Sequence, residues 1–203
     1  MRKVFTERDI PAWGRFEIPE GSIVTPSARD SARQRGVEIV ERPAHELGGA
    51  ARPEETVAIG SDHGGFALKQ ALLPVLAELG LTARDVGVHE EKAVDYPDIA
   101  VAVAELVVSG AAARGVIVDG AGIGSAMAAN KVAGIRAALC YDVASARNSR
   151  EHNDANVLTL GGRLLSASQA EAVLRTWLAT PFAGGRHQAR VDKIRALDAR
   201  RSS

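Results

Sequence analysis

From Thr56 onward, short apolar runs alternate with longer amphipathic stretches, and no other feature of the chain constrains the fold as strongly. Each apolar run has the length of a strand and stops at a polar or glycine-rich turn. Each amphipathic stretch has the length and periodicity of a helix. Regular alternation of this kind predicts an α/β domain built on a parallel sheet with helices on both faces.

The predicted elements form five strand–helix pairs followed by a basic terminal helix. Turn residues set their limits; Gly80, for example, closes the first helix. The terminal helix carries apolar Val191, Ile194 and Leu197 along one side. We expect strands over 56–62, 82–88, 114–120, 135–142 and 156–162, and helices over 64–80, 96–110, 122–132, 143–152, 167–180 and 186–200.

Residues 1–55 differ from the rest because they are rich in charge and proline. The segment 25–36, "TPSARDSARQRG", predicts a helix with a threonine cap and a proline in its first turn. "VEIVER", residues 37–42, alternates like a strand. Residues 43–55 read as a linker, because they lack apolar periodicity. We therefore expect a small amino-terminal extension with its linker over 1–55, and a separate domain over 56–203.

Composition narrows the class of protein. Lysine plus arginine and aspartate plus glutamate number 25 each, so the net charge is zero, and aromatic residues make up 4%. Neither value favours a nucleic-acid partner or an anionic membrane. The single cysteine, Cys140, excludes an intrachain disulfide framework and a cysteine cluster for zinc. No stretch resembles a secretory signal or a membrane span, and we expect a cytoplasmic protein.

Four turns with polar or glycine residues follow predicted strands. They read "SDHGG", "DGAGIG", "YD" and "GGR". In open parallel sheets, ligands bind beyond the carboxyl ends of the strands. We therefore expect these turns to converge on one edge of the sheet and to form the site there.

The turn "DGAGIGS", 119–125, is the strongest single candidate for a binding loop. Alternating glycines let backbone N–H groups approach an oxyanion, and the next helix points its positive end there. Such loops also serve simply to pack a helix tightly on a sheet. The loop lacks the spacing of a dinucleotide fingerprint and the lysine of a P-loop, so we expect no nucleotide cofactor. Its first residue, Asp119, is an acid at a place suited to an anion.

The other candidates each have a structural alternative. Asp62 could cap a helix, with His63 an ordinary surface residue, and His152 with Asn153 could be polar loop residues. The segment "GGRHQAR" supplies Arg186, His187 and Arg190, and arginines one helical turn apart either clamp a phosphate or lie on a solvated basic helix. Asp62, His63, Asp119 and His152 offer metal-ligand chemistry without a helical ligand spacing, and we expect no metal site.

Five separated segments share an order that resembles a known family. They are "VAIGSDHGGFALK", "VDYPDIA", "GAGIGSAMAANKVAGIRAALC", "SARNSREHNDANVLTLGGR" and "FAGGRHQARVDKI". From about residue 56 to 197 the chain resembles the ribose-5-phosphate isomerase type B family, which includes galactose-6-phosphate isomerase subunits. The resemblance implies a Rossmann-like three-layer α/β/α domain with a five-stranded sheet. It also implies a homodimer or tetramer whose active sites are shared between subunits, and isomerisation of a phosphorylated sugar without a cofactor.

The resemblance also implies roles for individual residues. The residue matching His152 opens the furanose ring, with Asn153 beside it, and the glycine loop stabilises the enediolate oxyanion. Residues matching Asp62 and His63 touch the sugar, the match of Tyr96 lines the pocket, and the arginines hold the phosphate, some of them across the dimer. The implied substrate-binding positions are Asp62, His63, Tyr96, Gly120, Ala121, Gly122, Gly124, Ser125, Asn153, Arg163, Arg186 and Arg190.

Two departures from the family's pattern concern the base. Many members have cysteine at the position of Asp119 and threonine at that of Ala121, and a second branch has glutamate at the position of Ser125. The isomerisation needs a group that moves a proton between two neighbouring carbons through a cis-enediol. A carboxylate is able to do this. We therefore expect Asp119 to be the proton-transfer base, the alternative being that it caps the turn or binds a sugar hydroxyl.

The sequence as a whole indicates an aldose–ketose isomerase acting on a phosphorylated tetrose, pentose or hexose, with Asp119 and His152 as catalytic residues. The alternative is a sugar-phosphate binding protein with little or no catalysis, within a larger assembly. The segment 20–39, "EGSIVTPSARDSARQRGVEI", is similar to a segment of some enzymes of bacterial microcompartments. The extension is therefore interpreted as docking on a protein shell or a neighbouring enzyme, or else as a structural cap on the catalytic dimer.

Overall fold

The structure, a computed structural model, describes residues 4–11, 14–42, 55–90 and 92–199. The chain divides into two compact units, Met1–Arg52 and Pro53–Ser203. Most of the predicted linker, residues 43–54, lies outside the described residues.

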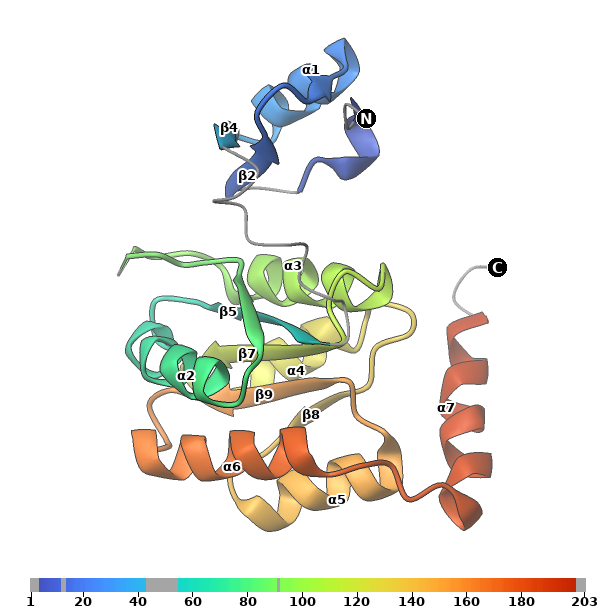
Figure 1. Ribbon diagram of the computed structural model, residues 1–203. Coiled ribbons are helices and arrows are strands. Elements are labelled where there is room, and N and C mark those ends of the chain that lie inside the picture. Colours follow the sequence, from blue (N-terminus) through green and yellow to red (C-terminus); the bar gives the residue numbers. More distant parts are fainter. Residues whose placement is uncertain (1–3, 12–13, 43–54, 91, 200–203) are drawn as a thin grey trace. The chain divides into compact units, whose positions relative to one another are not determined.

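The larger unit is built on a five-stranded sheet in which every neighbouring pair is parallel. The strand order is β6-β5-β7-β9-β8, with β7 at the centre (Figure 1). This arrangement confirms the predicted fold class and the number of strands. The strands are β5 (Thr56–Ser61), β6 (Thr82–Asp85), β7 (Arg114–Asp119), β8 (Ala137–Leu139) and β9 (Val157–Gly161).

Helices cover both faces of this sheet, as the alternating pattern predicts (Figure 1). One layer contains α2 (Phe66–Glu78), α5 (Val143–Asn153) and α6 (Ala167–Ala179). The other contains α3 (Tyr96–Val108) and α4 (Ile123–Ala129), which pack against each other.

The two faces of the sheet differ in the strand residues that lie beneath the helices. Toward α2 and α6, branched residues such as Ile59, Val116 and Leu158 fill the core. Toward α3 the strands carry glycine; a Cβ added at Gly60 would lie 2.7 Å from the Ile99 side chain. A helix therefore approaches the sheet more closely on this second face, because no strand side chain separates them there.

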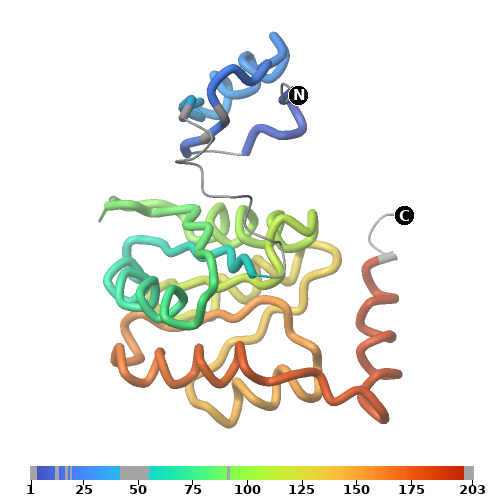
Figure 2. The backbone as a smooth tube through the Cα atoms, viewed as in Figure 1, coloured from blue at the N-terminus to red at the C-terminus, as the bar shows by residue number. Residues whose placement is uncertain are grey.

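The carboxyl-terminal segment leaves these layers. After α6 the chain makes a short 3₁₀ turn, η3 (Gly185–His187), and continues as α7 (Gln188–Ala199), which stands beside the sheet (Figures 1 and 2). Of the three apolar residues expected along one side of this helix, Val191 is buried, whereas Ile194 and Leu197 are exposed. Within the described residues, no helix has the length and apolar character needed to cross a bilayer.

The smaller unit contains the two elements predicted for it. Helix α1 (Pro26–Gln34) begins as expected, because the Thr25 hydroxyl accepts the backbone N–H of Ala28 at 3.3 Å. Strand β4 (Val37–Arg42) follows directly.

The smaller unit also contains elements that the sequence analysis did not propose. Strand β2 (Gly14–Pro19) pairs in parallel with β4 along its whole length. A second parallel pair joins β1 (Val4–Phe5) to β3 (Ile23–Val24), with the 3₁₀ turn η1 (Glu7–Asp9) between β1 and β2. The unit has its own apolar core, made of Phe5, Ile10, Ile18, Val24, Ala28, Ala32 and Val37.

Candidate active site

The turns after β5, β7 and β9 meet at the carboxyl edge of the sheet, as expected. Asp119 pairs with Gly161 at the ends of β7 and β9. Beyond that pair, the N–H of Gly162 donates to the Asp119 carbonyl at 2.7 Å, and the N–H of Arg163 donates to the Gly120 carbonyl at 3.0 Å. The remaining predicted turn, "YD" after β8, contacts this group through Tyr141, whose hydroxyl donates to the Ala121 carbonyl at 2.9 Å.

Glycines allow these turns to lie against one another. A Cβ at Gly64 would be 3.2 Å from the Cα of Gly120, and a Cβ at Gly124 would overlap the ring of Tyr96. Gly122 has a φ of +79°, in the left-handed region that favours glycine. The predicted pocket residue Tyr96 therefore lies against the glycine loop.

The Asp119 carboxylate is buried and faces its own loop. Its Oδ1 accepts the N–H of Ala121 at 2.8 Å and also the N–H of Gly122. Its Oδ2 accepts the N–H of Ser125 at 2.9 Å and the Ser125 hydroxyl at 2.5 Å. A carboxylate has about four lone-pair sites. All of them are occupied by donors of the loop 119–125.

This arrangement explains why an acid stands at the start of an anion-binding loop. Backbone donors at the start of α4 surround an anion, as the glycine pattern predicts, and that anion is the side chain of Asp119 itself. The contacts are those of the turn-capping alternative. Within the described residues, no hydrogen bond engages the N–H groups of Gly120, Ile123 and Gly124. These three donors are the ones left for a ligand.

Tyr141 and Asp119 hold the same peptide group of the loop from its two ends. The phenol of Tyr141 donates to the carbonyl oxygen of Ala121, and the N–H of the same peptide, on Gly122, donates to Asp119. The orientation of this peptide decides which of its groups faces a ligand. Sequence reasoning placed Tyr141 at the edge but gave it no role, because its contact with Ala121 joins residues that are 20 positions apart.

The other predicted residues at this edge differ in exposure. Asp62 is buried, and its Oδ1 accepts the N–H of Gly65 at 2.9 Å, so it caps the turn. His63 and Arg163 are exposed. The Arg163 side chain extends along Gly120, where a Cβ would lie 3.7 Å from its Cδ. An arginine therefore borders the free N–H of Gly120.

A second cluster of predicted residues lies around the end of α5. His152 and Asn153 are the last residues of that helix. The rings of His152 and His187 stack with centroids 4.1 Å apart and planes 8° apart. The side-chain nitrogen Nδ2 of Asn148 lies 2.8 Å from Nδ1 of His152. Arg186 and Arg190, on η3 and α7, are exposed on either side of His187.

The two clusters lie at opposite edges of the sheet. Helix α5 runs antiparallel to the strands, so His152 lies near the start of β9, whereas Asp119 lies beside its end. Five strand residues span about 16 Å. One chain therefore does not bring His152, Asn153 and the terminal arginines to the glycine loop. The metal alternative that grouped Asp62, His63, Asp119 and His152 is wrong for a single chain for the same reason.

Burial lowers the pKa of His187 below its ordinary value, and the positive charges of His152, Arg186 and Arg190 lower it further. A lowered pKa means that the folded state favours the neutral ring. The stability gained is complete above the ordinary value of about 6.5 and is lost as the pH falls through the lowered pKa. We expect an NMR titration of the ring protons to give a pKa for His187 below the ordinary histidine value of about 6.5.

The variant His152→Asn separates the causes of this shift. It removes one positive neighbour and keeps a polar side chain, so the pKa of His187 is expected to rise toward its ordinary value. A pKa for His187 at or above the ordinary histidine value in the unaltered protein would contradict the stacked, buried arrangement.

Comparison with known proteins gives the relationship of the larger unit. The family model for ribose/galactose isomerases matches residues 57–194. The chain belongs to this family. The ribose/galactose isomerase family includes ribose-5-phosphate isomerase B of Escherichia coli, which is 42% identical over 146 residues, covering 72% of this chain and 98% of that protein. D-erythrulose-4-phosphate isomerase of Pectobacterium atrosepticum is 38% identical, covering 68% of this chain and 92% of that protein.

Solved structures of the ribose/galactose isomerase family have the same fold. Ribose-5-phosphate isomerase B of Clostridium thermocellum matches with a TM-score of 0.71 and 46% identity, covering 72% of this chain and 99% of that one. The family resemblance and the Rossmann-like fold are therefore confirmed. Both relatives named for a ribose isomerase match over almost their whole length but cover 72% of this chain, and the family model begins at residue 57.

Proposed function

We propose that this chain isomerises a phosphorylated sugar between its aldose and ketose forms, through a cis-enediol and without a cofactor. The observation that carries the proposal is the composition of the loop 119–125 at one edge of the sheet. The loop contains the buried Asp119 carboxylate and N–H donors without a hydrogen-bond partner among the described residues, and the Arg163 side chain lies beside it. Unbonded N–H groups suit an enediolate oxygen, and an arginine beside them suits a phosphate. Relatives that share the fold are isomerases of a pentose phosphate and of a tetrose phosphate.

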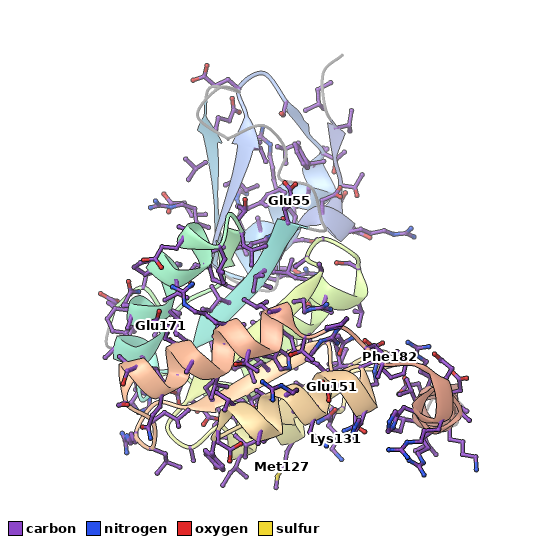
Figure 3. The ribbon with its side chains drawn as sticks, turned by 60° about the horizontal axis from the view of Figure 1, so that its bottom comes forward. Glu55, Met127, Lys131, Glu151, Glu171 and Phe182 are labelled. Atoms are coloured by element: carbon purple, nitrogen blue, oxygen red, sulfur yellow. The ribbon has the colours of Figure 1, made fainter. Side chains whose placement is uncertain are left out.

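The complete site is proposed to need two chains. In one chain, His152 and the terminal arginines lie at the amino edge of the sheet, whereas the glycine loop lies at the carboxyl edge. A second copy that presents its amino edge to the first chain's loop completes the site twice in a symmetric dimer. Apolar side chains are exposed on α4, where Met127 points outward (Figure 3), and on α7 at Ile194 and Leu197. A homodimer or a tetramer of such dimers covers these surfaces.

In this site Asp119 is proposed to transfer the proton, His152 of the partner subunit to open the sugar ring, and the arginines to hold the phosphate. Because all lone pairs of Asp119 are occupied, accepting a proton requires that one donor be released. The Ser125 hydroxyl is the donor that rotates away most easily, since the other three are backbone N–H groups. The same carboxylate then caps the loop at rest and acts as the base when sugar is bound.

Because donors of its own loop occupy every lone pair of the Asp119 carboxylate, a second function is also a candidate. A chain whose Asp119 stays bonded to its own loop would keep the donors and arginines but lack a base. It would bind sugar phosphates without isomerising them. The two candidates differ in one measurable respect, the exchange of carbon-bound hydrogen with solvent.

The test is deuterium incorporation from heavy water into a panel of phosphorylated tetroses, pentoses and hexoses. We expect deuterium at C1 or C2 of at least one sugar. A binding protein would shift the NMR signals of a bound sugar without any incorporation, and that outcome would refute the isomerase proposal.

The role of His152 has a chemical control in the same panel. A tetrose 4-phosphate cannot close a furanose ring, because its O4 carries the phosphate, whereas a pentose 5-phosphate closes one. The variant His152→Asn is therefore expected to lose exchange with cyclic pentose phosphate by on the order of 10²-fold and to keep it with the tetrose phosphate. Equal losses with both sugars would contradict a ring-opening role.

The amino-terminal unit is proposed to dock the enzyme on a partner, such as a microcompartment shell protein or a neighbouring enzyme. Its supporting observation is the separate apolar core around Ile18 and Ala28, which the unit buries by itself. Deletion of residues 1–50 is expected to leave catalysis intact and to abolish co-localisation with the partner. Loss of the folded dimer on deletion would instead identify the unit as a structural cap.

A further inference from the structure

Asp154 lies directly after α5, one residue beyond Asn153, and its contacts are unusual for a single carboxylate. Its φ of +47° is in the left-handed region. Aspartate tolerates this conformation better than most residues, because its short side chain forms local hydrogen bonds, but the conformation still costs free energy. The side chain is only partly exposed. The residue is therefore held in a particular orientation by its surroundings.

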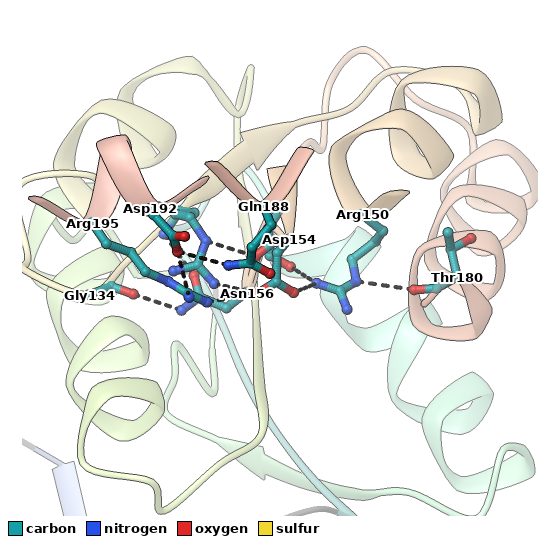
Figure 4. A network of polar contacts seen from close by, with 10 residues as sticks. Gly134, Arg150, Asp154, Asn156, Thr180, Gln188, Asp192 and Arg195 are labelled. Atoms are coloured by element: carbon teal, nitrogen blue, oxygen red, sulfur yellow. Dashed lines mark hydrogen bonds and ion pairs between the residues drawn. The ribbon is translucent and has the colours of Figure 1, made fainter. Parts of the chain in front are cut away.

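Three arginines from three segments converge on this carboxylate (Figure 4). Arg150 of α5 donates to Oδ1 at 2.9 Å. Arg136, before β8, donates to Oδ2 at 3.0 Å and to the Asp154 carbonyl at 2.9 Å. Arg195 of α7 donates to Oδ2 at 3.2 Å. The carboxylate thus links the body of the larger unit to its terminal helix.

The three arginines depend on Asp154 to different degrees. Arg150 is buried and also donates to the carbonyls of Thr180 and Ala155, so it has other acceptors. The side chain of Arg195 is 47% exposed, and among the described residues its ion pairs are those with Asp154 and, at 3.5 Å, with Asp192 of its own helix. Without the Asp154 charge, Arg195 would face two other guanidinium groups. It would leave first, because like charges repel and it is the one free to move.

Among the described residues, few other polar or buried side chains attach α7 to the rest of the unit. Of the side chains described in this helix, residues 188–198, Val191 alone is buried. Asp198 accepts the N–H of Gly134 at 2.9 Å, and ahead of the helix His187 stacks on His152. The attachment of α7 is therefore largely electrostatic, and Asp154 is its central anion.

We propose that Asp154 is a positioning residue for phosphate binding. It fixes α7 against the end of α5, and so sets Arg186 and Arg190 at a constant place relative to His152. The proposal rests on the proposed function for the identity of the ligand, a phosphorylated sugar, and on the contacts of Arg195 for the mechanism. Two arginines that grip one phosphate must be held together before binding, since otherwise binding must order them.

The test uses the full-length protein and the variant Asp154→Asn, because asparagine also tolerates the left-handed conformation. We expect amide hydrogen exchange in residues 188–199 to accelerate at least about tenfold while β9 keeps its protection. The KM for a turned-over sugar phosphate, and the Kd for inorganic phosphate measured by calorimetry, are both expected to rise on the order of tenfold, with kcat within about threefold. The control Asp192→Asn removes the charge of the 3.5 Å ion pair with Arg195, and the amide oxygen can still accept the Gln188 side-chain N–H that Asp192 accepts at 2.8 Å. It should change neither the hydrogen exchange of α7 nor the Kd for phosphate.

A second variant keeps the proposal testable if Asp154→Asn does not fold. Arg195→Gln alters an exposed side chain and should raise the Kd for phosphate and the exchange of α7 in the same way. Unchanged exchange in α7, or faster exchange with unchanged phosphate affinity, would overturn the positioning role. Absence of isomerisation in the unaltered protein would refute the proposed function but leave the exchange and phosphate measurements to decide the role of Asp154.

Discussion

The variant Asp119→Asn is expected to lower solvent-hydrogen exchange into the sugar by about 10³-fold or more, because it removes the proposed base while keeping its shape. It is also expected to lower the free energy of unfolding by about 2 kcal/mol. An amide has one oxygen in place of two, so its NH₂ group would face the backbone N–H of Ser125, and a donor would oppose a donor, while the Ser125 hydroxyl would have to turn and accept. Exchange is measured by NMR in heavy water and stability by urea unfolding.

Ser125→Ala is the matched control for this variant. It removes the hydroxyl donor to Asp119 and keeps the backbone N–H, so a loss of stability of about 1 kcal/mol is expected. If Asp119 is the base, exchange survives in this variant. An Asp119→Asn protein that is less stable yet exchanges at the unaltered rate would assign Asp119 to turn capping alone.

The variant Gly65→Ala is expected to destabilise the larger unit by about 3 kcal/mol or more. A Cβ at Gly65 would overlap the carbonyl group of Val118, which belongs to the central strand β7. Neither backbone moves without disturbing the sheet or the start of α2. Since small domains are stable by about 5–15 kcal/mol, a loss of this size is readily measured by urea unfolding.

Gly120→Ala supplies the comparison at the same edge of the sheet. A Cβ there would meet only the flexible Arg163 side chain, at 3.7 Å, so stability is expected to change by less than about 1 kcal/mol. Equal urea midpoints for Gly65→Ala and the unaltered protein would show that the turn after β5 does not pack on β7 as described.

The alternating pattern is sufficient to predict the strands and helices of the larger unit, but it predicts only α1 and β4 of the smaller one. Each large-unit strand is a short, fully or partly buried run between clear turns, which is the signal that periodicity captures best. Phe16 and Ile18 of β2 also alternate with polar residues, so a signal for that strand was present. Its parallel partner β4 is separated by α1, and no local pattern predicts such a pairing.

The candidate site likewise contains features that the sequence pattern predicts and features that it does not. The four turns at the carboxyl edge could be predicted to converge, because parallel strands place their ends together. The direction of the Asp119 side chain could not, because it depends on where the start of α4 places the donors of Ser125. The opposite position of His152 follows from the direction of α5, an inference that the sequence analysis did not draw.

By itself the sequence determined the class of fold, the edge of the sheet that carries the glycine loop, and the family, because these depend on periodicity and on residue order. Only the tertiary structure decided that Asp119 is bonded to its own loop and that His152 lies with Arg186 and Arg190 at the far edge. It also decided that Asp154 joins three arginines. Hydrogen bonds and ion pairs act over a few ångströms, so they form between residues that packing brings together, whatever their separation along the chain.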